Sequence, residues 1–322
     1  MTGILFIRYG ASVLLKFCFA LIRRIATSLM AISTLLLLSM TWQVSAKTEL
    51  PLAPVQALLS EKRLVVGLAV SELGTNSRWQ LNPQQQFPLM SVFKFPQALL
   101  VLKLVDEGKL KLDQQVSIDR RQLMLKTWSP MLKDHLAQQF SLSIRELLRY
   151  SVSLSDNNAC DILFNLIGGP AALQQYFVDL DITDVQIRIN EYGLNQKFSA
   201  QYENWIKPAA ALELLEKFYA AELLSSHSQQ LLWDLMLETP TGQKRLKAGL
   251  GSDALLIHKT GTSSQDTDGL LAGINDIGIV QLPDGRAYAI AVFVKDSYES
   301  FDDTEKLIAD ISRKVYQAFT QQ

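Results

Sequence analysis

The sequence predicts an α+β fold: one antiparallel sheet flanked by terminal helices, with an all-helical domain inserted between its strands. Three observations support this prediction. Strand-like segments occur near both ends of the chain, segments with a 3.6-residue apolar period fill the middle, and an amphipathic helix follows the last strand. A composition of 48% hydrophobic and 20% charged residues is typical of a folded globular protein and argues against disorder.

The strands are predicted from short apolar runs that are bounded by turn residues. They cover residues 63–73, 78–81, 255–259, 269–282 and 287–294. The turn Pro283-Asp284-Gly285 would join the last two strands as a hairpin.

The helices are predicted from apolar residues that recur at helical spacing. They cover residues 91–107, 143–152, 157–167, 170–177, 208–220, 228–237 and 303–318. The apolar stripe of the last helix consists of Leu307, Ile308, Ile311, Val315 and Phe319. The predicted division is a sheet domain of residues 47–88 and 241–322 around a helical domain of residues 89–240. A cleft at their junction is the expected place for a small-molecule site.

The first 46 residues differ in kind from the rest. They combine four basic residues with no acidic one, an apolar stretch from Ile25 to Met40, and the small-x-small sequence Val44-Ser45-Ala46. This order is typical of a secretory signal peptide, so we expect export to the periplasm; an uncleaved membrane anchor is the alternative. Without this segment the chain has 27 basic and 32 acidic residues, a net charge of −5. That sign argues against nucleic acid as a partner.

Neither the cysteines nor the histidines indicate a metal site. Cys18 lies in the signal segment, and Cys160 lies in an apolar helical pattern, where a small core residue is expected. The three histidines have no metal-ligand spacing, and no G-x-S-x-G elbow indicates a Ser-His-Asp hydrolase. His258 adjoins a lysine of interest, but in a strand its side chain would point to the opposite face, so we expect a structural role.

A serine and a lysine open the first long helix, in the order Ser91-Val92-Phe93-Lys94. A serine hydroxyl is a weak nucleophile and needs a base beside it. Lys94 would lie on the same helix face, and the helix N-terminus favours negative charge that develops at Ser91. The S-x-x-K pattern alone also fits a polar first turn with a solvated lysine.

A second polar motif, Ser155-Asp156-Asn157, directly precedes an apolar helix. All three residue types cap helices well, so an N-cap is the simple interpretation. In a catalytic interpretation, Ser155 passes a proton to a leaving nitrogen and Asn157 binds an amide carbonyl of the substrate.

The third motif is Lys259-Thr260-Gly261-Thr262-Ser263, at the end of a predicted strand. Lys259 would offer positive charge to a carboxylate, Gly261 would let a ligand approach the backbone, and the hydroxyl groups would donate hydrogen bonds. The backbone N–H groups of Ser91 and Thr262 would form an oxyanion hole. A strand end with a polar turn is the alternative.

The order S-x-x-K, S-D-N, K-T-G is specific even though each motif alone is weak. With it the chain resembles class A serine β-lactamases and penicillin-binding proteins over nearly the whole length that follows the signal segment. The resemblance implies the β-lactamase/DD-peptidase-like form of the α+β fold. It also implies a Ser91 acyl-enzyme, a β-lactam substrate and no cofactor.

A fourth motif favours the β-lactamase branch. Glu191-Tyr192-Gly193-Leu194-Asn195 resembles the E-x-x-L-N of the class A omega loop, expected here near residues 188–206. The resemblance implies that Glu191 activates the water that hydrolyses the acyl-enzyme and that Asn195 helps to hold this water. The acylation base, Lys94 or Glu191 through water, is left open.

Further matches indicate the PER- and VEB-like extended-spectrum subgroup. They are Phe95-Pro96, Asn158-Ala159-Cys160-Asp161 and Gln201-Tyr202-Glu203-Asn204-Trp205. Trp128 occupies the place of an aromatic residue on the cleft wall, with core packing as its alternative. The usual arginine after K-T-G is missing, and Arg245 is the expected replacement as a ligand of the substrate carboxylate.

Two alternatives share the first three motifs. A DD-peptidase would cleave D-Ala-D-Ala peptides without using Glu191, and a non-catalytic penicillin-binding sensor would be acylated once and stay acylated. We expect a monomeric hydrolase that acts on cephalosporins and penicillins, with no stable association with the membrane after signal cleavage.

Overall fold

The computed structural model describes residues 52–321, so the predicted signal peptide at 1–46 lies outside the described residues. No helix within 52–321 is long and apolar enough to span a membrane.

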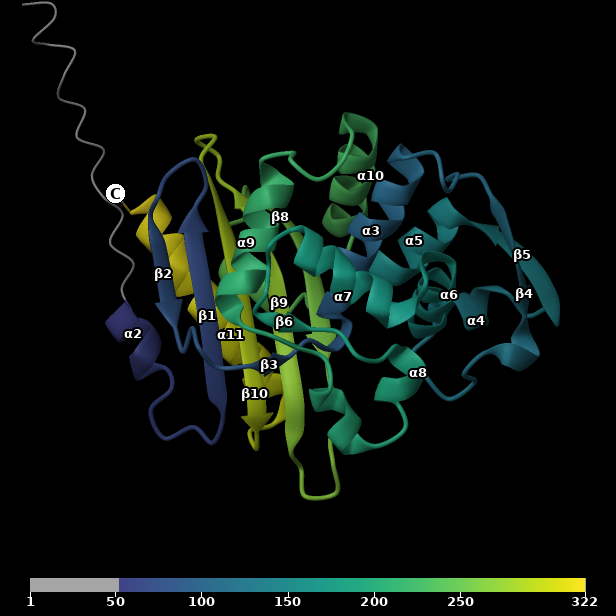
Figure 1. Cartoon of the computed structure of the whole chain (residues 1–322). Helices are drawn as coiled ribbons and strands as arrows, with labels where there is room; N and C mark the ends of the chain where they lie inside the picture. The colour runs from purple at the N-terminus through teal and green to yellow at the C-terminus, as the bar shows by residue number, and fades with distance from the viewer. Residues whose placement is uncertain (1–51, 322) are drawn as a thin grey trace, which may run out of the picture. The chain divides into compact units, whose positions relative to one another are not determined.

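A five-stranded antiparallel sheet has the strand order β2-β1-β10-β9-β8 (Figure 1). Its strands are β1 (Val65–Glu72), β2 (Arg78–Leu81), β8 (Leu255–Thr262), β9 (Leu271–Gln281) and β10 (Ala287–Ser297). The N-terminal pair therefore joins the C-terminal strands through the β1–β10 ladder, as the sequence predicted. Strand β8 continues to Thr262, which carries the K-T-G residues within the strand at one edge of the sheet.

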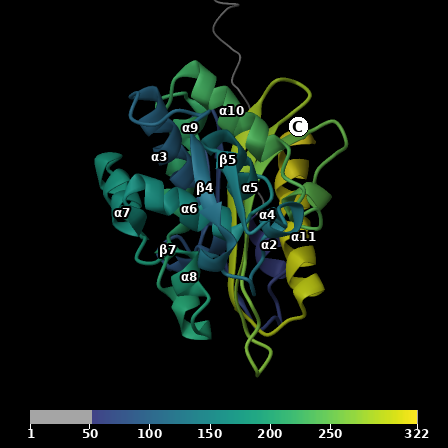
Figure 2. The same cartoon turned by 90° about the vertical axis from the view of Figure 1, so that its right-hand side faces the viewer.

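The helices lie between the early and the late strands of the sheet, or flank it at the chain ends. They are α2 (Leu52–Ala57), α3 (Lys94–Asp106), α4 (Pro130–Asp134), α5 (Ile144–Val152), α6 (Asn157–Ile167), α7 (Gly169–Asp179), α8 (Glu191–Leu194), α9 (Pro208–Tyr219), α10 (Ser226–Leu237) and α11 (Phe301–Thr320). Figures 1 and 2 show α11 along one face of the sheet, where α2 also packs, and α9 and α10 on the other side with helices α3 to α8. The α+β fold class is confirmed.

The two faces of the sheet bury separate apolar clusters. On one face, Val66, Leu68 and Val70 of β1 pack with Ile308 and Ile311 of α11. The other cluster joins alternate strand residues to the helical part of the chain. Because successive strand side chains point to opposite faces, a strand that is buried on both sides reads as a continuous apolar run, which is the pattern of β10 from Ala287 to Val294. Strand β9 is also buried along nearly its whole length, but Asn275 and Asp276 interrupt its apolar run.

Several short elements escape prediction because their runs are too short to show a period. They are the paired strands β4 (Gln115–Asp119) and β5 (Gln139–Ser143), the strands β3 (Phe87–Pro88), β6 (Val185–Gln186) and β7 (Trp205–Ile206), and the helices α2, α4 and α8. Strand β7 pairs with both β3 and β6, and so ties residue 206, at the end of the omega loop (188–206), to the chain just before Ser91.

The first long helix begins later than predicted. Residues Met90–Phe93 form a 3₁₀ turn, and α3 starts at Lys94. The predicted shared face of Ser91 and Lys94 on one α-helix is therefore replaced by a tighter turn in which Met90 has a left-handed φ of +47°. Such a φ is uncommon for a non-glycine residue and costs about 1–2 kcal/mol.

Candidate active site

A cleft of about 610 Å³ lies between the K-T-G strand, the 3₁₀ turn and the omega loop. Nine of the predicted site residues line it: Ser91, Trp128, Ser155, Asn157, Glu191, Asn195, Thr260, Thr262 and Ser263. The other four, Lys94, Arg245, Lys259 and Gly261, are buried behind its wall.

Ser91 sits where the 3₁₀ turn packs against β8. A Cβ at Gly261 would stand 2.7 Å from the Leu89 carbonyl oxygen and 3.0 Å from the Met90 Cβ. The space beside Gly261 is therefore filled by the chain around the nucleophile, whereas the sequence led us to expect a ligand there. Glycine permits the close approach of these two backbones.

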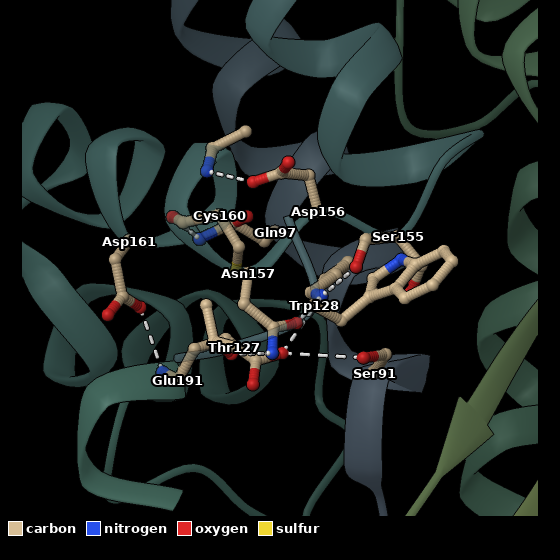
Figure 3. Close-up of polar contacts among 12 residues, drawn as sticks. Ser91, Gln97, Thr127, Trp128, Ser155, Asp156, Asn157, Cys160, Asp161 and Glu191 are labelled. Carbon is tan, nitrogen blue, oxygen red and sulfur yellow. Dashed lines mark hydrogen bonds and ion pairs between the residues drawn. The ribbon is translucent and has the colours of Figure 1, made fainter. Parts of the chain in front are cut away.

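Ser91 and Lys94 meet at the carboxylate of Glu191. Ser91 Oγ donates to Glu191 Oε1 at 3.3 Å, and Lys94 Nζ lies 2.9 Å from the same oxygen (Figure 3). Lys94 Nζ also donates to the Ser155 carbonyl at 2.8 Å and to Asn157 Oδ1 at 2.7 Å. An ammonium has three N–H donors, so these three acceptors use all of them. The group that accepts the Ser91 hydrogen bond is Glu191.

Glu191 is held by its backbone as well as by its side chain. It begins the short helix α8, capped by Asn190, and its N–H donates to Asp161 Oδ1 at 2.8 Å. The next N–H, of Tyr192, donates to Asp161 Oδ2 at 2.9 Å. Asn195 Nδ2 donates to the Glu191 carbonyl at 2.8 Å, which leaves the Asn195 amide oxygen as an acceptor at the cleft.

The structure confirms the N-cap interpretation of the S-D-N motif and brings its outer two residues to the cleft. Asp156 is the N-cap of α6: its carboxylate accepts from the Ala159 N–H at 2.8 Å and from the Met131 N–H at 2.8 Å. Ser155 and Asn157, on either side, line the cleft. Ser155 has a φ of +57°, a second strained non-glycine residue at this site.

A fully buried lysine lies behind Ser155. Lys259 Nζ donates to Ser155 Oγ at 2.9 Å and to the Thr260 carbonyl at 3.1 Å. Burial, together with the positive charge of Lys94, lowers the pKa of Lys259 well below its usual range. A lysine that readily gives up a proton thus contacts the hydroxyl of Ser155.

The edge of β8 supplies donors to the cleft. The Ser263 N–H donates inward to the Gly273 carbonyl at 2.8 Å. Because successive N–H groups of a strand alternate in direction, the Thr262 N–H points outward, toward the side on which the 3₁₀ turn packs. This is the direction that an oxyanion hole shared with the Ser91 N–H requires. The Thr260 hydroxyl pairs with that of Thr241 at 2.7 Å.

Arg245 is buried and turned toward β8 instead of the open cleft. Its guanidinium donates to Glu305 Oε1 at 2.9 Å, to the carbonyls of Gly261 and Asn275 at 3.0 and 2.9 Å, and to Thr262 Oγ1 at 2.7 Å. Thr262 accepts this bond, so its own hydroxyl hydrogen is free to point into the cleft. Among the residues that line the cleft, Arg245 thus contacts Thr262.

Two exposed aromatic rings line the cleft. Trp128 is 55% exposed, which excludes core packing, and its Nε1 donates to the Leu154 carbonyl at 2.9 Å. Phe301, at the start of α11, is 40% exposed and its ring centre lies 5.9 Å from the Arg245 guanidinium carbon. Phe301 and Thr262 therefore lie at the same end of the cleft, where both contact Arg245.

The histidines and the thiol stay outside this chemistry. His258 Nδ1 bonds Asp276 Oδ1 at 2.9 Å in the interior, which agrees with a structural role. Cys160 is buried and burial raises its thiol pKa. No group of three or more His, Cys, Asp or Glu residues in the described part of the chain has the arrangement of a metal site.

Comparisons with known proteins identify this arrangement. A family model described as the β-lactamase enzyme family matches residues 53–319. The extended-spectrum β-lactamase PER-1 of Pseudomonas aeruginosa is 42% identical over 88% of this chain and 92% of its own length. The β-lactamase VEB-1 of the same species is 37% identical over 87% of this chain and 94% of its own. The chain belongs to the class A β-lactamase family.

Solved structures agree with this assignment. The crystal structure of the TLA-1 extended-spectrum β-lactamase superposes with a TM-score of 0.81 at 37% identity, over 83% of this chain and 97% of that one. A β-lactamase from Chitinophaga pinensis gives a TM-score of 0.81 at 42% identity, over 83% and 98% of the two chains. The chain is thus a class A serine β-lactamase of the PER- and VEB-like kind, as the sequence motifs indicated.

Sequence reasoning missed four residues of this β-lactamase site. Thr241, Gln201 and Phe301 line the cleft, and Asp161 holds the backbone of Glu191. Gln201 Oε1 accepts from the Ser264 N–H at 2.9 Å, so it links the omega loop to the segment after β8. Asp161 and Gln201 lie in the segments that match the PER- and VEB-like subgroup. Nothing in the sequence around them indicates that Asp161 contacts Glu191 or that Gln201 contacts Ser264.

Proposed function

We propose that the cleft hydrolyses the amide bond of β-lactams through an acyl-enzyme on Ser91, and that Glu191 is the base. The observation that carries this proposal is the position of Glu191 Oε1, 3.3 Å from Ser91 Oγ and 2.9 Å from Lys94 Nζ. One carboxylate oxygen is thereby within reach of the nucleophile and of a buried cation that stabilises its negative charge.

In acylation, the hydroxyl of Ser91 passes its proton to Glu191, directly or through a water, while Oγ attacks the ring carbonyl. Lys94 places a positive charge 2.9 Å from this carboxylate oxygen, beside the nucleophile. The N–H groups of Ser91 and Thr262 stabilise the oxyanion, a contribution that typically amounts to about 3 kcal/mol for each donor.

The leaving nitrogen needs a proton when the ring opens. Ser155 donates its hydroxyl proton, and Lys259, at 2.9 Å from Ser155 Oγ, replaces it. The lowered pKa of Lys259 supports this step, because a buried ammonium with a weakened hold on its proton is a better acid.

Deacylation uses the same carboxylate. The proton that Glu191 took in acylation first returns through the cleft to Lys259, which the ring opening left neutral, so that Glu191 is again a carboxylate. Glu191 then takes a proton from a water that the amide oxygen of Asn195 orients, the water attacks the ester, and the proton passes to Ser91 Oγ as the ester bond breaks. Asn157 binds the amide carbonyl of the substrate side chain. The carboxylate of the substrate is bound by the hydroxyls of Thr260, Thr262 and Ser263 and attracted by the positive charge of Lys259. No cofactor takes part in these steps.

The substrate range follows from the relatives and from the cleft walls. PER-1 and TLA-1 are named as extended-spectrum enzymes. We propose cephalosporins, bulky ones included, together with penicillins. Trp128 and Phe301 offer two exposed aromatic surfaces for the substituents of such substrates.

Processing, location, oligomeric state and domain division are proposed from the sequence and from the packing of the core. We propose a cleaved signal peptide at 1–46, a periplasmic enzyme without stable membrane association, and a monomer. The two apolar clusters support a sheet domain (47–88 and 241–322) around a helical domain (89–240).

A turnover assay separates hydrolysis from the alternatives. The protein from Lys47 onward is mixed with a chromogenic cephalosporin, and product is counted per active site. A β-lactamase releases many equivalents of product. A single equivalent would instead indicate a DD-peptidase or a penicillin-binding sensor, which keep the acyl group.

A further inference from the structure

A second cavity lies on the side of the omega loop that faces away from the cleft. It has a volume of about 330 Å³, and β4 with the segment after it, α6 and α8 form its walls. Along α8 the chain alternates between the two cavities: Glu191 lines the cleft, whereas its neighbours Asn190 and Tyr192 line the second cavity. We call the second cavity the outer pocket.

The walls of the outer pocket combine apolar and polar side chains around one half-buried acid. The apolar side chains are Val116, Ile118, Leu123, Met124, Ile162 and Leu166. Asp161 lies among them, and Lys, Arg and His are absent from the lining residues. The other lining carboxylate, Asp119, is paired with Arg121.

Asp161 is the unusual group in this pocket. Its oxygens accept the N–H groups of Glu191 and Tyr192, and no basic side chain among residues 52–321 forms an ion pair with it. Each carboxylate oxygen has a second lone pair, so two acceptor positions remain. Burial raises the pKa of Asp161 to about 7, because its two N–H donors and the positive charge of Lys94 offset only part of the lost solvation.

We propose that the outer pocket binds a small organic cation with an apolar body, such as an arylamidinium, at Asp161. An amidinium offers two parallel N–H donors that match the free lone pairs of a carboxylate. The apolar side chains of the lining and the exposed ring of Tyr192 fit an aromatic body.

Binding at this place acts on the cleft through α8. The ligand would compete for the Asp161 oxygens that accept the N–H groups of Glu191 and Tyr192. Weaker bonds to these N–H groups let the Glu191 side chain move, so bound ligand lowers kcat without blocking the binding of substrate. This effect on turnover rests on the proposed role of Glu191, whereas the binding itself does not.

The affinity depends on pH because only the ionised acid attracts a cation. The charged or titratable groups that face Asp161 are Glu191 and Tyr192 from α8, Lys94 from α3, Asp119 from β4 and Cys160 from its own helix. The charges of Glu191 and Lys94 shift the pKa of Asp161 in opposite directions. The ionisation of Asp161 itself therefore controls the binding of the cation. Below the pKa of Asp161, the dissociation constant should fall by about tenfold for each unit by which the pH rises, and above that pKa it should level off.

The test uses benzamidine as the probe and calorimetric titration as the binding readout. Asn165→Trp places a large side chain at an exposed position of the pocket wall, and Gln230→Trp makes the same change at an exposed position of α10 outside both cavities. The native protein and Gln230→Trp should bind benzamidine, more tightly at about pH 8 than at about pH 5, with kcat falling at unchanged KM. Asn165→Trp should retain its turnover and lose the binding.

Each opposite result would overturn the proposal. Equal binding by Asn165→Trp puts the ligand elsewhere, and a rise in KM alone puts it in the cleft. Saturable binding in the pocket with unchanged kcat refutes the coupling through Asp161. If Glu191→Ala still turns over normally, the proposed function fails, but the calorimetric result on the outer pocket is unaffected.

Discussion

The most informative perturbation concerns Arg245, which sequence comparison presents as a direct ligand of the substrate carboxylate. In the structure its donors are used inside the protein, and one of them bonds Thr262 Oγ1 at 2.7 Å. If Arg245 acts only by orienting that hydroxyl, its catalytic effect requires Thr262. A double-mutant cycle of Arg245→Met and Thr262→Val measures this dependence.

The expected magnitudes follow from the contacts. A hydrogen bond to a charged group contributes about 1.5–3 kcal/mol, so loss of the Thr262 hydroxyl should lower kcat/KM by about 10- to 150-fold. Arg245→Met should cost a similar factor. The double variant should lose little more than either single variant, with a coupling energy of about 1.5 kcal/mol or more.

Stability separates the structural role of Arg245 from its catalytic one. Arg245→Met leaves the Glu305 carboxylate, 10% exposed, without its partner, which costs about 3–5 kcal/mol of unfolding free energy in denaturant titrations. Glu305→Gln in the same background should recover part of it. Thr262→Val, at an exposed side chain, should change unfolding little. Additive losses of kcat/KM in the double variant would refute the indirect role and mean that Arg245 touches substrate.

Three further predictions concern other residues of the site. The folded protein keeps the Asp161 proton where the unfolded chain has lost it, so this group lowers stability as the pH rises from about 4 through about 7. The unfolding free energy of Asp161→Asn relative to the native protein should therefore increase over that range by up to about 4 kcal/mol, and a flat difference would contradict the raised pKa. Phe301→Leu should lower kcat/KM by about three- to tenfold for cephalosporins with an aromatic group beside the carboxylate. Equal losses for a cephalosporin with only a methyl group there would remove Phe301 from substrate binding. Gly261→Ala should destabilise the protein by about 1–3 kcal/mol and reduce acylation, because its Cβ meets the Leu89 carbonyl at 2.7 Å; acylation at the native rate would show that the turn can move away.

The parts of the molecule that could be predicted are those with a period or a motif. Alternation and length identified the strands at both ends, and the S-x-x-K, S-D-N and K-T-G motifs identified residues that the fold brings to one cleft. Glu191 and Lys94 are 97 positions apart in the chain, yet the motif order was enough to place them in one site.

The parts that could not be predicted depend on contacts between distant residues. Asp161 is one polar residue in a helix pattern, and its role exists only because the omega loop folds back onto α6. Arg245 was expected to bind the substrate carboxylate, but the sequence gives no sign of its burial or of its four acceptors within the protein, Thr262 among them. The late start of α3 reflects a left-handed Met90, which no propensity favours and which tertiary packing imposes.

Glu191 is proposed to activate the water that releases the acyl group from Ser91. The direct measurement is mass spectrometry of Glu191→Ala after brief exposure to a cephalosporin, with Glu203→Ala as the control. Glu203 is also an omega-loop carboxylate, but it pairs with Arg188 at 3.4 Å, away from the cleft.

We expect Glu191→Ala to accumulate a covalent adduct on Ser91, while Glu203→Ala turns over like the native enzyme and shows none. Turnover by Glu191→Ala at the native rate, with no adduct, would contradict this expectation.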